Sequence, residues 1–226
     1  MNDFLEKYGK DSVNHKIGKL YQSETTEEDI SKVLDDPHES WRVKDNALQH
    51  TKVTREHIGN VLDNPNENRD LKYAALKHPK ATTEHIGKVL DDHDEDRIVR
   101  SAAIEHPKAT AEHISKVLDN PDESREMKIL AISHFKAKPE HVSRVLDNHN
   151  EDWRVKLSAI HHPKATAEHI SKVLDNPESK FAVKEAALNH INANEDHYKK
   201  VMNNPDEHPK LKQLAQKIYN ERFGEP

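Results

Sequence analysis

The chain repeats itself every 28 residues, and this period constrains its fold more than any other feature. The string HPKATAEHISKVLDNP occurs twice without a change, at 106–121 and at 162–177. Related copies lie between and around these two, so that seven repeats follow one another from Thr25 to Arg222 without an insertion. Periods of roughly 20 to 50 residues are typical of repeat proteins in which each repeat packs on its neighbours.

Three positions of each repeat are apolar almost throughout, at the spacing i, i+3 and i+4 that marks one face of a helix. The three columns are Ile30, Ile58, Ile86, Ile114, Val142, Ile170 and Tyr198; Val33, Val61, Val89, Val117, Val145, Val173 and Val201; and Leu34, Leu62, Leu90, Leu118, Leu146, Leu174 and Met202. Thr110 is a typical N-cap before this face, and Pro139 suits a first helical turn. We therefore expect a first helix in every repeat.

A second helix is predicted after the turn that ends each first helix, which begins with Asn or Asp and usually continues with Pro. In the fourth repeat it runs roughly from Glu123 to Ser133, with Met127, Leu130 and Ala131 on its apolar face. His-Pro ends this helix in three repeats, because the residue before a proline is pushed out of the helical region. The sequence thus predicts an all-α solenoid at 25–222, an N-terminal capping half-repeat at 1–24 that includes Phe4 and Leu5, and a C-terminal tail at 223–226.

Two known repeat families resemble this pattern. Asp94 followed by Val99-Arg100 and Ala102-Ala103 resembles the second-helix signature of the HEAT repeat, and the longer string through His106-Pro107 to Ile114 and Val117-Leu118 resembles the leucine-rich-repeat variant. The resemblance covers nearly the whole chain and implies a right-handed α-solenoid of about seven helix pairs with atypical ends. The 28-residue repeat is shorter than typical HEAT repeats and longer than the variant's, and the absence of cysteine rules out the variant family's iron–sulfur cluster.

The composition fits a thin stack of repeats better than a globular core. Only 33% of the residues are hydrophobic and 34% are charged, a balance that indicates disorder unless a repeat architecture removes the need for a deep core. The net charge of −6 argues against a dedicated nucleic-acid binder. The chain has no cysteine and no apolar run long enough for a signal peptide or a membrane span. We expect a soluble, cytoplasmic protein with no membrane partner.

A constant basic column allows two interpretations. It consists of Lys44, Lys72, Arg100, Lys128, Lys156, Lys184 and Lys212. A line of cations could follow a phosphate backbone. The HEAT resemblance instead implies a structural ladder, in which each cation bonds a polar residue of the column six positions earlier, in its own or the next repeat. That acceptor column is His38, Asn66, Asp94, Asp122, Asn150, Glu178 and Asp206. The ladder is the favoured interpretation.

Twelve of the 18 histidines fall in two columns. They are His50, His78, His106, His134, His162 and His190, and His57, His85, His113, His141, His169 and His197. Neighbouring helices lie roughly 8–10 Å apart, whereas Zn–N bonds are about 2 Å long, so one column cannot share an ion. Histidines that cap helix ends are the favoured interpretation, and we predict neither a metal nor a cofactor. Two further basic columns, one beginning at Lys52 and one at Lys32, are interpreted as solvated faces.

The columns that vary between repeats lie on one stripe of the second helix, because they are spaced by four and eight residues. The candidate protein-binding residues on this second-helix stripe are Trp41, Asp45, Arg69, Tyr73, Arg97, Arg125, Ile129, Trp153, Leu157 and Phe181. Trp, Tyr and Arg are enriched at binding hot spots, and the HEAT resemblance places second helices on the concave face. The alternative is that Trp41, Trp153 and Phe181 fill gaps between neighbouring helices.

No enzymatic motif stands out. The chain has five glycines, no glycine-rich phosphate loop and no cysteine nucleophile. Asp45 near Trp41 resembles HEAT-like alkylpurine DNA glycosylases, but the regular repeats and the negative charge depart from them. We therefore expect a non-enzymatic module that binds a protein or peptide. The alternatives are nucleic-acid binding through Arg69, Arg97 and Arg125, and a purely structural role. The oligomeric state stays open.

Overall fold

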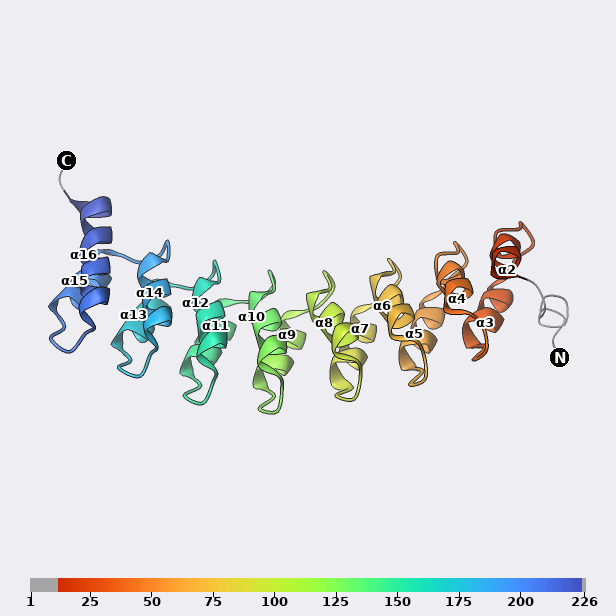
Figure 1. Ribbon diagram of the computed structural model, residues 1–226, viewed down its shortest axis with the longest axis horizontal. Coiled ribbons are helices and arrows are strands. Elements are labelled where there is room, and N and C mark those ends of the chain that lie inside the picture. The colour runs from red at the N-terminus through yellow and green to blue at the C-terminus, as the bar shows by residue number, and fades with distance from the viewer. Residues whose placement is uncertain (1–11, 225–226) are drawn as a thin grey trace. The chain divides into compact units, whose positions relative to one another are not determined.

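The computed structural model describes residues 12–224, and every regular element in that range is an α-helix (Figure 1). Phe4 and Leu5 of the predicted N-terminal cap, and residues 225–226 of the predicted tail, lie outside the described residues. Contacts divide the chain into two compact parts, Met1–Thr110 and Ala111–Pro226. We call them the N-terminal part and the C-terminal part.

The N-terminal part contains a leading helix and three helix pairs. The helices are α2 (Val13–Leu20), α3 (Glu27–Asp35), α4 (Trp41–Leu48), α5 (Arg55–Asp63), α6 (Arg69–Lys77), α7 (Thr83–Asp91) and α8 (Arg97–Glu105). The C-terminal part contains four pairs. These are α9 (Ala111–Asp119), α10 (Arg125–Ser133), α11 (Pro139–Asp147), α12 (Trp153–His161), α13 (Ala167–Asp175), α14 (Phe181–Asn189), α15 (Glu195–Asn203) and α16 (Pro209–Phe223).

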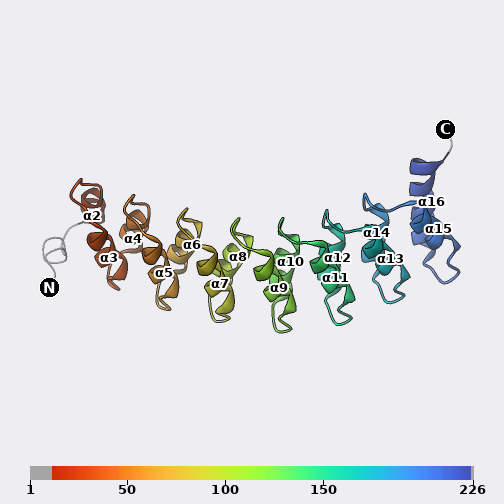
Figure 2. The same cartoon turned by 180° about the vertical axis from the view of Figure 1, so that it is seen from behind.

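Within each part the helices form two layers (Figures 1 and 2). The first helices of successive repeats contact one another, as α3, α5 and α7 do, and so do the second helices, as α10, α12, α14 and α16 do. Each first helix also packs against the second helix of its own repeat, for example α13 against α14. The predicted all-α repeat solenoid is confirmed, and the protein is a helical repeat protein.

The first helices form where the sequence predicts them, because their caps and their apolar faces agree. Thr54 is the N-cap of α5, and its hydroxyl accepts the backbone N–H of His57. Ile58, Val61 and Leu62 on the next turns are buried. Pro139 occupies the first turn of α11, as expected. The three apolar columns are buried throughout except at Met202, which is half-buried in the last repeat.

The second helices bury a slightly different face from the predicted one. In α10, Met127 and Ala131 are buried as expected, but Leu130 is only half-buried and Ile132 takes its place in the core. The helix also begins at Arg125 rather than at Glu123, because Ser124 is its N-cap and accepts the backbone N–H of Met127. The turn before α10 therefore includes Glu123 and Ser124, two residues that the sequence analysis assigns to the helix.

The two ends of the described range depart from the template in ways that cover the stack. The helix α2 occupies the second-helix register, and its Leu20 is fully buried. At the other end, α16 runs to Phe223, so the predicted tail at 223–226 begins too early. Tyr198 replaces the usual isoleucine; its buried hydroxyl donates to Leu188 O at 3.0 Å and accepts from Arg222 Nη1 at 3.0 Å.

Candidate functional site

The second-helix stripe begins at the first residue of each second helix. Trp41, Arg69, Arg97, Arg125, Trp153 and Phe181 open α4, α6, α8, α10, α12 and α14, respectively. Trp41 is 52% exposed, Tyr73 40% and Phe181 39%. Since a large exposed aromatic side chain leaves apolar surface in water, Trp41 and Tyr73 in the N-terminal part and Phe181 in the C-terminal part are unusual for a chain this polar.

The other stripe residues are less open. Asp45, Ile129, Trp153 and Leu157 are half-buried. The Trp153 ring lies 4.7 Å from the guanidinium of Arg154, and the Phe181 ring packs edge-on against His208 of the next repeat at 5.3 Å. Gap filling between helices thus describes Phe181 in part, because its ring contacts the next repeat, whereas Trp41 is 52% exposed.

The stripe arginines are exposed, but acids accompany two of them. Arg69 Nε lies 3.4 Å from Asp70 Oδ1, and Arg125 Nη2 lies 2.6 Å from Glu126 Oε1. Arg125 Nη1 also approaches Asp152 Oδ2 at 3.9 Å. The neighbouring carboxylates partly cancel the positive field that a phosphate backbone would require.

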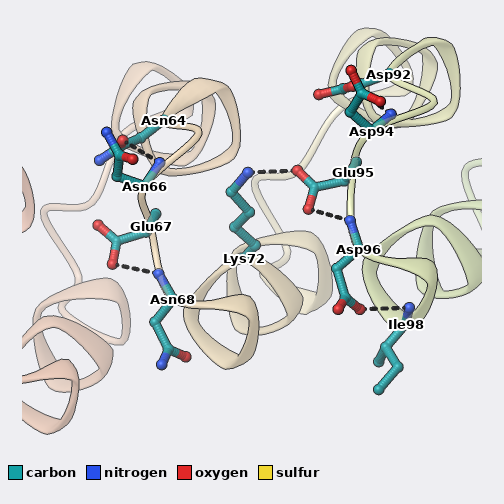
Figure 3. Close-up of polar contacts among 10 residues, drawn as sticks. All are labelled: Asn64, Asn66, Glu67, Asn68, Lys72, Asp92, Asp94, Glu95, Asp96 and Ile98. Atoms are coloured by element: carbon teal, nitrogen blue, oxygen red, sulfur yellow. Dashed lines mark hydrogen bonds and ion pairs between the residues drawn. The ribbon is translucent and has the colours of Figure 1, made fainter.

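The constant basic column forms buried ion pairs with a column of glutamates. Each lysine reaches 23 residues forward into the next repeat, in the pairs Lys16–Glu39 (2.8 Å), Lys44–Glu67 (2.6 Å), Lys72–Glu95 (2.5 Å), Lys128–Glu151 (3.1 Å) and Lys184–Glu207 (2.6 Å). Figure 3 shows the Lys72–Glu95 pair. Lys16 extends the column into α2. We call this set the lysine–glutamate ladder.

The predicted acceptors of this ladder are wrong. Asn66 and Asp94 stand one position before Glu67 and Glu95, and their side chains are exposed. A turn holds them there, since the Asp94 backbone N–H donates to Asp92 Oδ1 at 3.0 Å (Figure 3). The next residue along the chain therefore turns inward toward the preceding repeat, and it is a glutamate.

Each ladder glutamate makes a second bond that fixes its carboxylate. Glu67 Oε1 accepts the backbone N–H of Asn68 at 2.9 Å, and Glu95 Oε1 accepts that of Asp96 at 2.8 Å (Figure 3). In the last repeat Glu207 Oε1 accepts from His208 N at 2.9 Å. Burial alone would raise the pKa of Glu207, but hydrogen bonds from Lys184 and from the His208 backbone hold that pKa below its ordinary value.

Two lysines of the basic column depart from this pattern, Lys212 and Lys156. Lys212 in the last repeat donates to Pro205 O at 3.3 Å. In the third repeat an arginine takes the place of the lysine, and Arg100 Nη2 donates to Leu90 O at 3.3 Å. The side-chain ammonium of Lys156 has no hydrogen bond or ion pair to any of residues 12–224, because Ser179 stands where the other repeats have the glutamate. The sequence interpretation missed this break, although comparing column 179 with its equivalents reveals it.

The first-turn histidines act as helix caps that also join neighbouring repeats. His57 Nδ1 accepts the backbone N–H of the N-cap Thr54 at 3.0 Å, and its Nε2 lies 2.7 Å from Ser31 Oγ in the preceding repeat. Since Nδ1 is an acceptor, Nε2 carries the proton and donates to the serine. His141 repeats this arrangement and also donates from Nε2 to Ala111 O at 3.1 Å. Burial lowers the pKa of His141, His169 and His197.

The second histidine column has a capping role that the sequence did not predict. Nδ1 of His78 accepts the backbone N–H of Lys80 at 3.1 Å and caps the turn after the helix. The predicted contact with carbonyls also occurs, since His190 Nε2 donates to His162 O at 3.3 Å at the end of the preceding second helix. The following lysines are not a solvated face: Lys108 Nζ donates to Pro79 O at 2.7 Å and to Ala81 O at 2.6 Å in the preceding repeat. The basic column on the first helix is paired with acids, as in Lys88–Asp63 at 2.9 Å.

Cavities accompany the places where the repeat departs from its own template. A cavity of about 710 Å³ in the N-terminal part is lined by His85 and by Gly59, which replaces the serine of other repeats. In the C-terminal part, cavities of about 560 and 290 Å³ share Lys156 and Ser179 as lining residues, and Trp153 and Lys180 line the smaller one.

Further features of residues 12–224 bear on possible ligands. No group of three or more His, Asp or Glu side chains in this range is arranged to hold a metal ion. No helix within it is long and apolar enough to cross a membrane. Large apolar side chains outside the stripe are also exposed, and Phe135 (64%) and Ile191 (78%) are the most exposed of them. Both stand where three other repeats have a proline after the histidine.

Comparison with protein-family models, with curated proteins and with solved structures finds no match for this chain. The all-α repeat architecture therefore rests on the sequence period and on the helix contacts, while the HEAT resemblance stays a prediction.

Proposed function

We propose that the protein is a non-enzymatic binding module that takes a protein or peptide partner on the second-helix stripe. The exposed aromatic side chains of Trp41, Tyr73 and Phe181 carry this proposal. Aromatic side chains bury a large area at low entropic cost, and together with arginine they dominate binding hot spots. The same positions differ from repeat to repeat while the packing columns stay constant, which is how a repeat scaffold can vary its specificity without changing its fold.

Nucleic-acid binding has less support. The ladder cations that would follow a phosphate backbone are buried, with Lys44, Lys72 and Lys128 each no more than 6% exposed. The stripe arginines Arg69 and Arg125 lie beside carboxylates. A phosphate backbone needs accessible and uncompensated cations, so we treat this alternative as an outcome of the test.

The test compares two sets of exposed apolar residues. The tagged protein is cross-linked in cells, captured and analysed beside Trp41→Ala/Tyr73→Ala/Phe181→Ala and beside a matched control off the stripe, Phe135→Ala/Ile191→Ala. A partner bound by the stripe is expected to bind the triple variant about 30-fold more weakly, which corresponds to about 2 kcal/mol, and the control normally. Circular dichroism checks that both variants stay helical.

The result contradicts the proposal if the control loses the partner and the triple variant keeps it. Nuclease treatment and a second salt concentration complete the design. Recovery of nucleic acid, with binding that falls steeply as salt rises, would replace the proposal by the nucleic-acid alternative.

A further inference from the structure

Six ladder positions in the described range place a glutamate before a second helix, at Glu39, Glu67, Glu95, Glu123, Glu151 and Glu207. In the pairs Lys44–Glu67, Lys72–Glu95, Lys128–Glu151 and Lys184–Glu207, the carboxylate has two donors. One is the lysine ammonium of the preceding repeat, and the other is the backbone N–H of the residue after the glutamate. Two converging donors hold the carboxylate in one place and in one orientation. The repeat therefore builds a carboxylate-binding position and normally fills it with its own side chain.

The junction between the fifth and sixth repeats keeps both donors and omits the glutamate. Lys156 of the fifth repeat occupies the ladder position on α12 and is half-buried, and its ammonium has no acceptor among residues 12–224. The backbone N–H of Lys180, which corresponds to that of Asn68 or Asp96, likewise has no acceptor in this range. Ser179 between them is too short to reach Lys156 and makes no side-chain hydrogen bond there.

The space for the missing carboxylate is open. Lys156, Ser179 and Lys180 line the cavity of about 290 Å³, together with Trp153 of the stripe. That volume suits one side chain rather than a larger ligand. The larger neighbouring cavity adds Leu146, Val173 and Val183 as an apolar wall.

The charges around the cavity leave the lysine available. Two of the three acids that line this cavity already have partners: Asp152 lies 3.6 Å from Arg154, and Glu151 lies 3.1 Å from Lys128. In the larger neighbouring cavity, Asp147 pairs with Lys172. Glu178 is exposed and lies on the rim without an ion pair to Lys156, and Lys180 and His149 add positive or neutral groups. An anion entering the cavity therefore meets an uncompensated ammonium.

We propose that Lys156 Nζ and the Lys180 backbone N–H form a carboxylate-binding site that takes a glutamate or aspartate side chain of a protein partner. The choice of a protein partner rests on the proposed function, because Trp153 belongs both to the stripe and to the wall of this cavity. The carboxylate chemistry does not rest on it, since the same pair of donors holds a glutamate in the other repeats.

The test titrates the ¹⁵N-labelled full chain with N-acetyl-glutamate N-methylamide at constant ionic strength, and in parallel with the matching glutamine compound. We expect a saturable downfield shift of the Lys180 amide proton and a change at the Lys156 side chain with the glutamate probe alone. Ser179→Glu supplies an internal carboxylate and should weaken probe binding at least tenfold, or about 1.4 kcal/mol. Ser179→Ala keeps the site open and should bind the probe as the wild type does.

A gain of binding tests the same idea in the N-terminal part. Glu95→Ser removes the ladder glutamate from Lys72 and should make the Asp96 amide respond to the probe. Equal shifts with the glutamine probe, or equal affinity in Ser179→Glu, would overturn the proposal whether or not Glu95→Ser folds. Inorganic phosphate serves as a competitor, and binding of phosphate without binding of the glutamate probe would also overturn it.

Failure of the stripe and failure of this site are separable. Trp41→Ala/Tyr73→Ala lies in the N-terminal part and should leave the probe titration unchanged. A partner captured through the stripe should bind more weakly to Ser179→Glu and normally to Ser179→Ala. A partner held equally by both variants contradicts the assignment of this site to the partner.

Discussion

Lys156 and Lys184 occupy the same position in successive repeats of the C-terminal part, yet only one of them has a carboxylate partner. Lys184 lies 2.6 Å from Glu207 and is 6% exposed, whereas Lys156 faces Ser179 and is half-buried beside a cavity. Both helices keep the same buried alanine and valine columns. The comparison teaches that a repeat protein can open a binding position by omitting one side chain, because the neighbouring repeats continue to hold the donors in place.

The first-turn histidines show the same contrast in the N-terminal part. His57 donates to Ser31, whereas His85 faces Gly59, and the side-chain hydrogen bonds at His85 within residues 12–224 are its capping bonds with Thr82. The cavity of about 710 Å³ lies at this second break. Its lining is mainly polar side chains with bonds of their own, so a ligand is not evident from the geometry.

The largest expected effect comes from removing Lys184, and removal of Lys156 is the matched control. Lys184→Met leaves the buried Glu207 without its counter-charge and is expected to lower the free energy of unfolding by about 3 kcal/mol or more. Lys156→Met removes a charge that has no partner, so its effect should stay within about 1 kcal/mol. Urea denaturation of the two variants measures both values. Equal costs would remove the distinction between the two positions.

Completing the incomplete position should stabilise the fold. Ser179→Glu adds a charge-assisted pair with Lys156 and an acceptor for the Lys180 N–H, and should raise the free energy of unfolding by about 1–2 kcal/mol. Ser179→Gln has the same length without the charge and is the matched control. The idea of a preformed carboxylate position fails if glutamate stabilises no more than glutamine does.

Mild acid should weaken the histidine caps, with a smaller effect at each site. Burial lowers the pKa of His141, His169 and His197, so the unfolded chain takes up protons before the folded one does. The stabilisation is complete above the unfolded-state pKa of about 6.5 and is lost as the pH falls below it toward the lowered folded-state values. A proton on Nδ1 would also break the bond from the N-cap amide.

Denaturation midpoints at pH 7.5, 6.5 and 5.5 measure this loss. His141→Gln keeps an acceptor and a donor but removes one titrating group, so its pH dependence should be shallower than that of the wild type. A stability that rises toward pH 5.5 would contradict the assigned role of these histidines.

The smallest expected effect is at Gly59, which stands where other repeats have a serine beside the first-turn histidine. Glycine inside a helix costs roughly 0.5–1 kcal/mol relative to alanine. A Cβ at Gly59 would lie 3.3 Å from His85 Nε2, and the serines of other repeats coexist with their histidines at 2.7–3.0 Å between Oγ and Nε2. Gly59→Ser should therefore raise the free energy of unfolding by about 0.5 kcal/mol and, unlike Gly59→Ala, give His85 an acceptor. Loss of stability with serine would show that the close contact dominates.

Much of the stack is predictable from single residues. The i, i+3, i+4 columns of isoleucine, valine and leucine predict the first helices, because the period of a helix is local and the residues that face the core must be apolar. The second helices are less well predicted: Leu130 and Ile132 of α10 are both apolar, and only packing decides that Ile132 is the buried one. On the stripe, Trp41 and Trp153 occupy the same position of their repeats, so the sequence does not show that Trp41 is exposed and Trp153 half-buried.

The sequence by itself determines the 28-residue period, the helix pairs and the constancy of the basic column, since these depend on spacing along the chain. Only the tertiary structure decides which acid each cation meets. Asn66 and Glu67 are adjacent and both polar, but the turn at Asn64 directs one outward and the other toward Lys44 of the preceding repeat. The direction of a side chain at a turn depends on how two repeats stack. The sequence shows that Ser179 interrupts a column of glutamates, but only the tertiary structure shows that Lys156 thereby loses its partner.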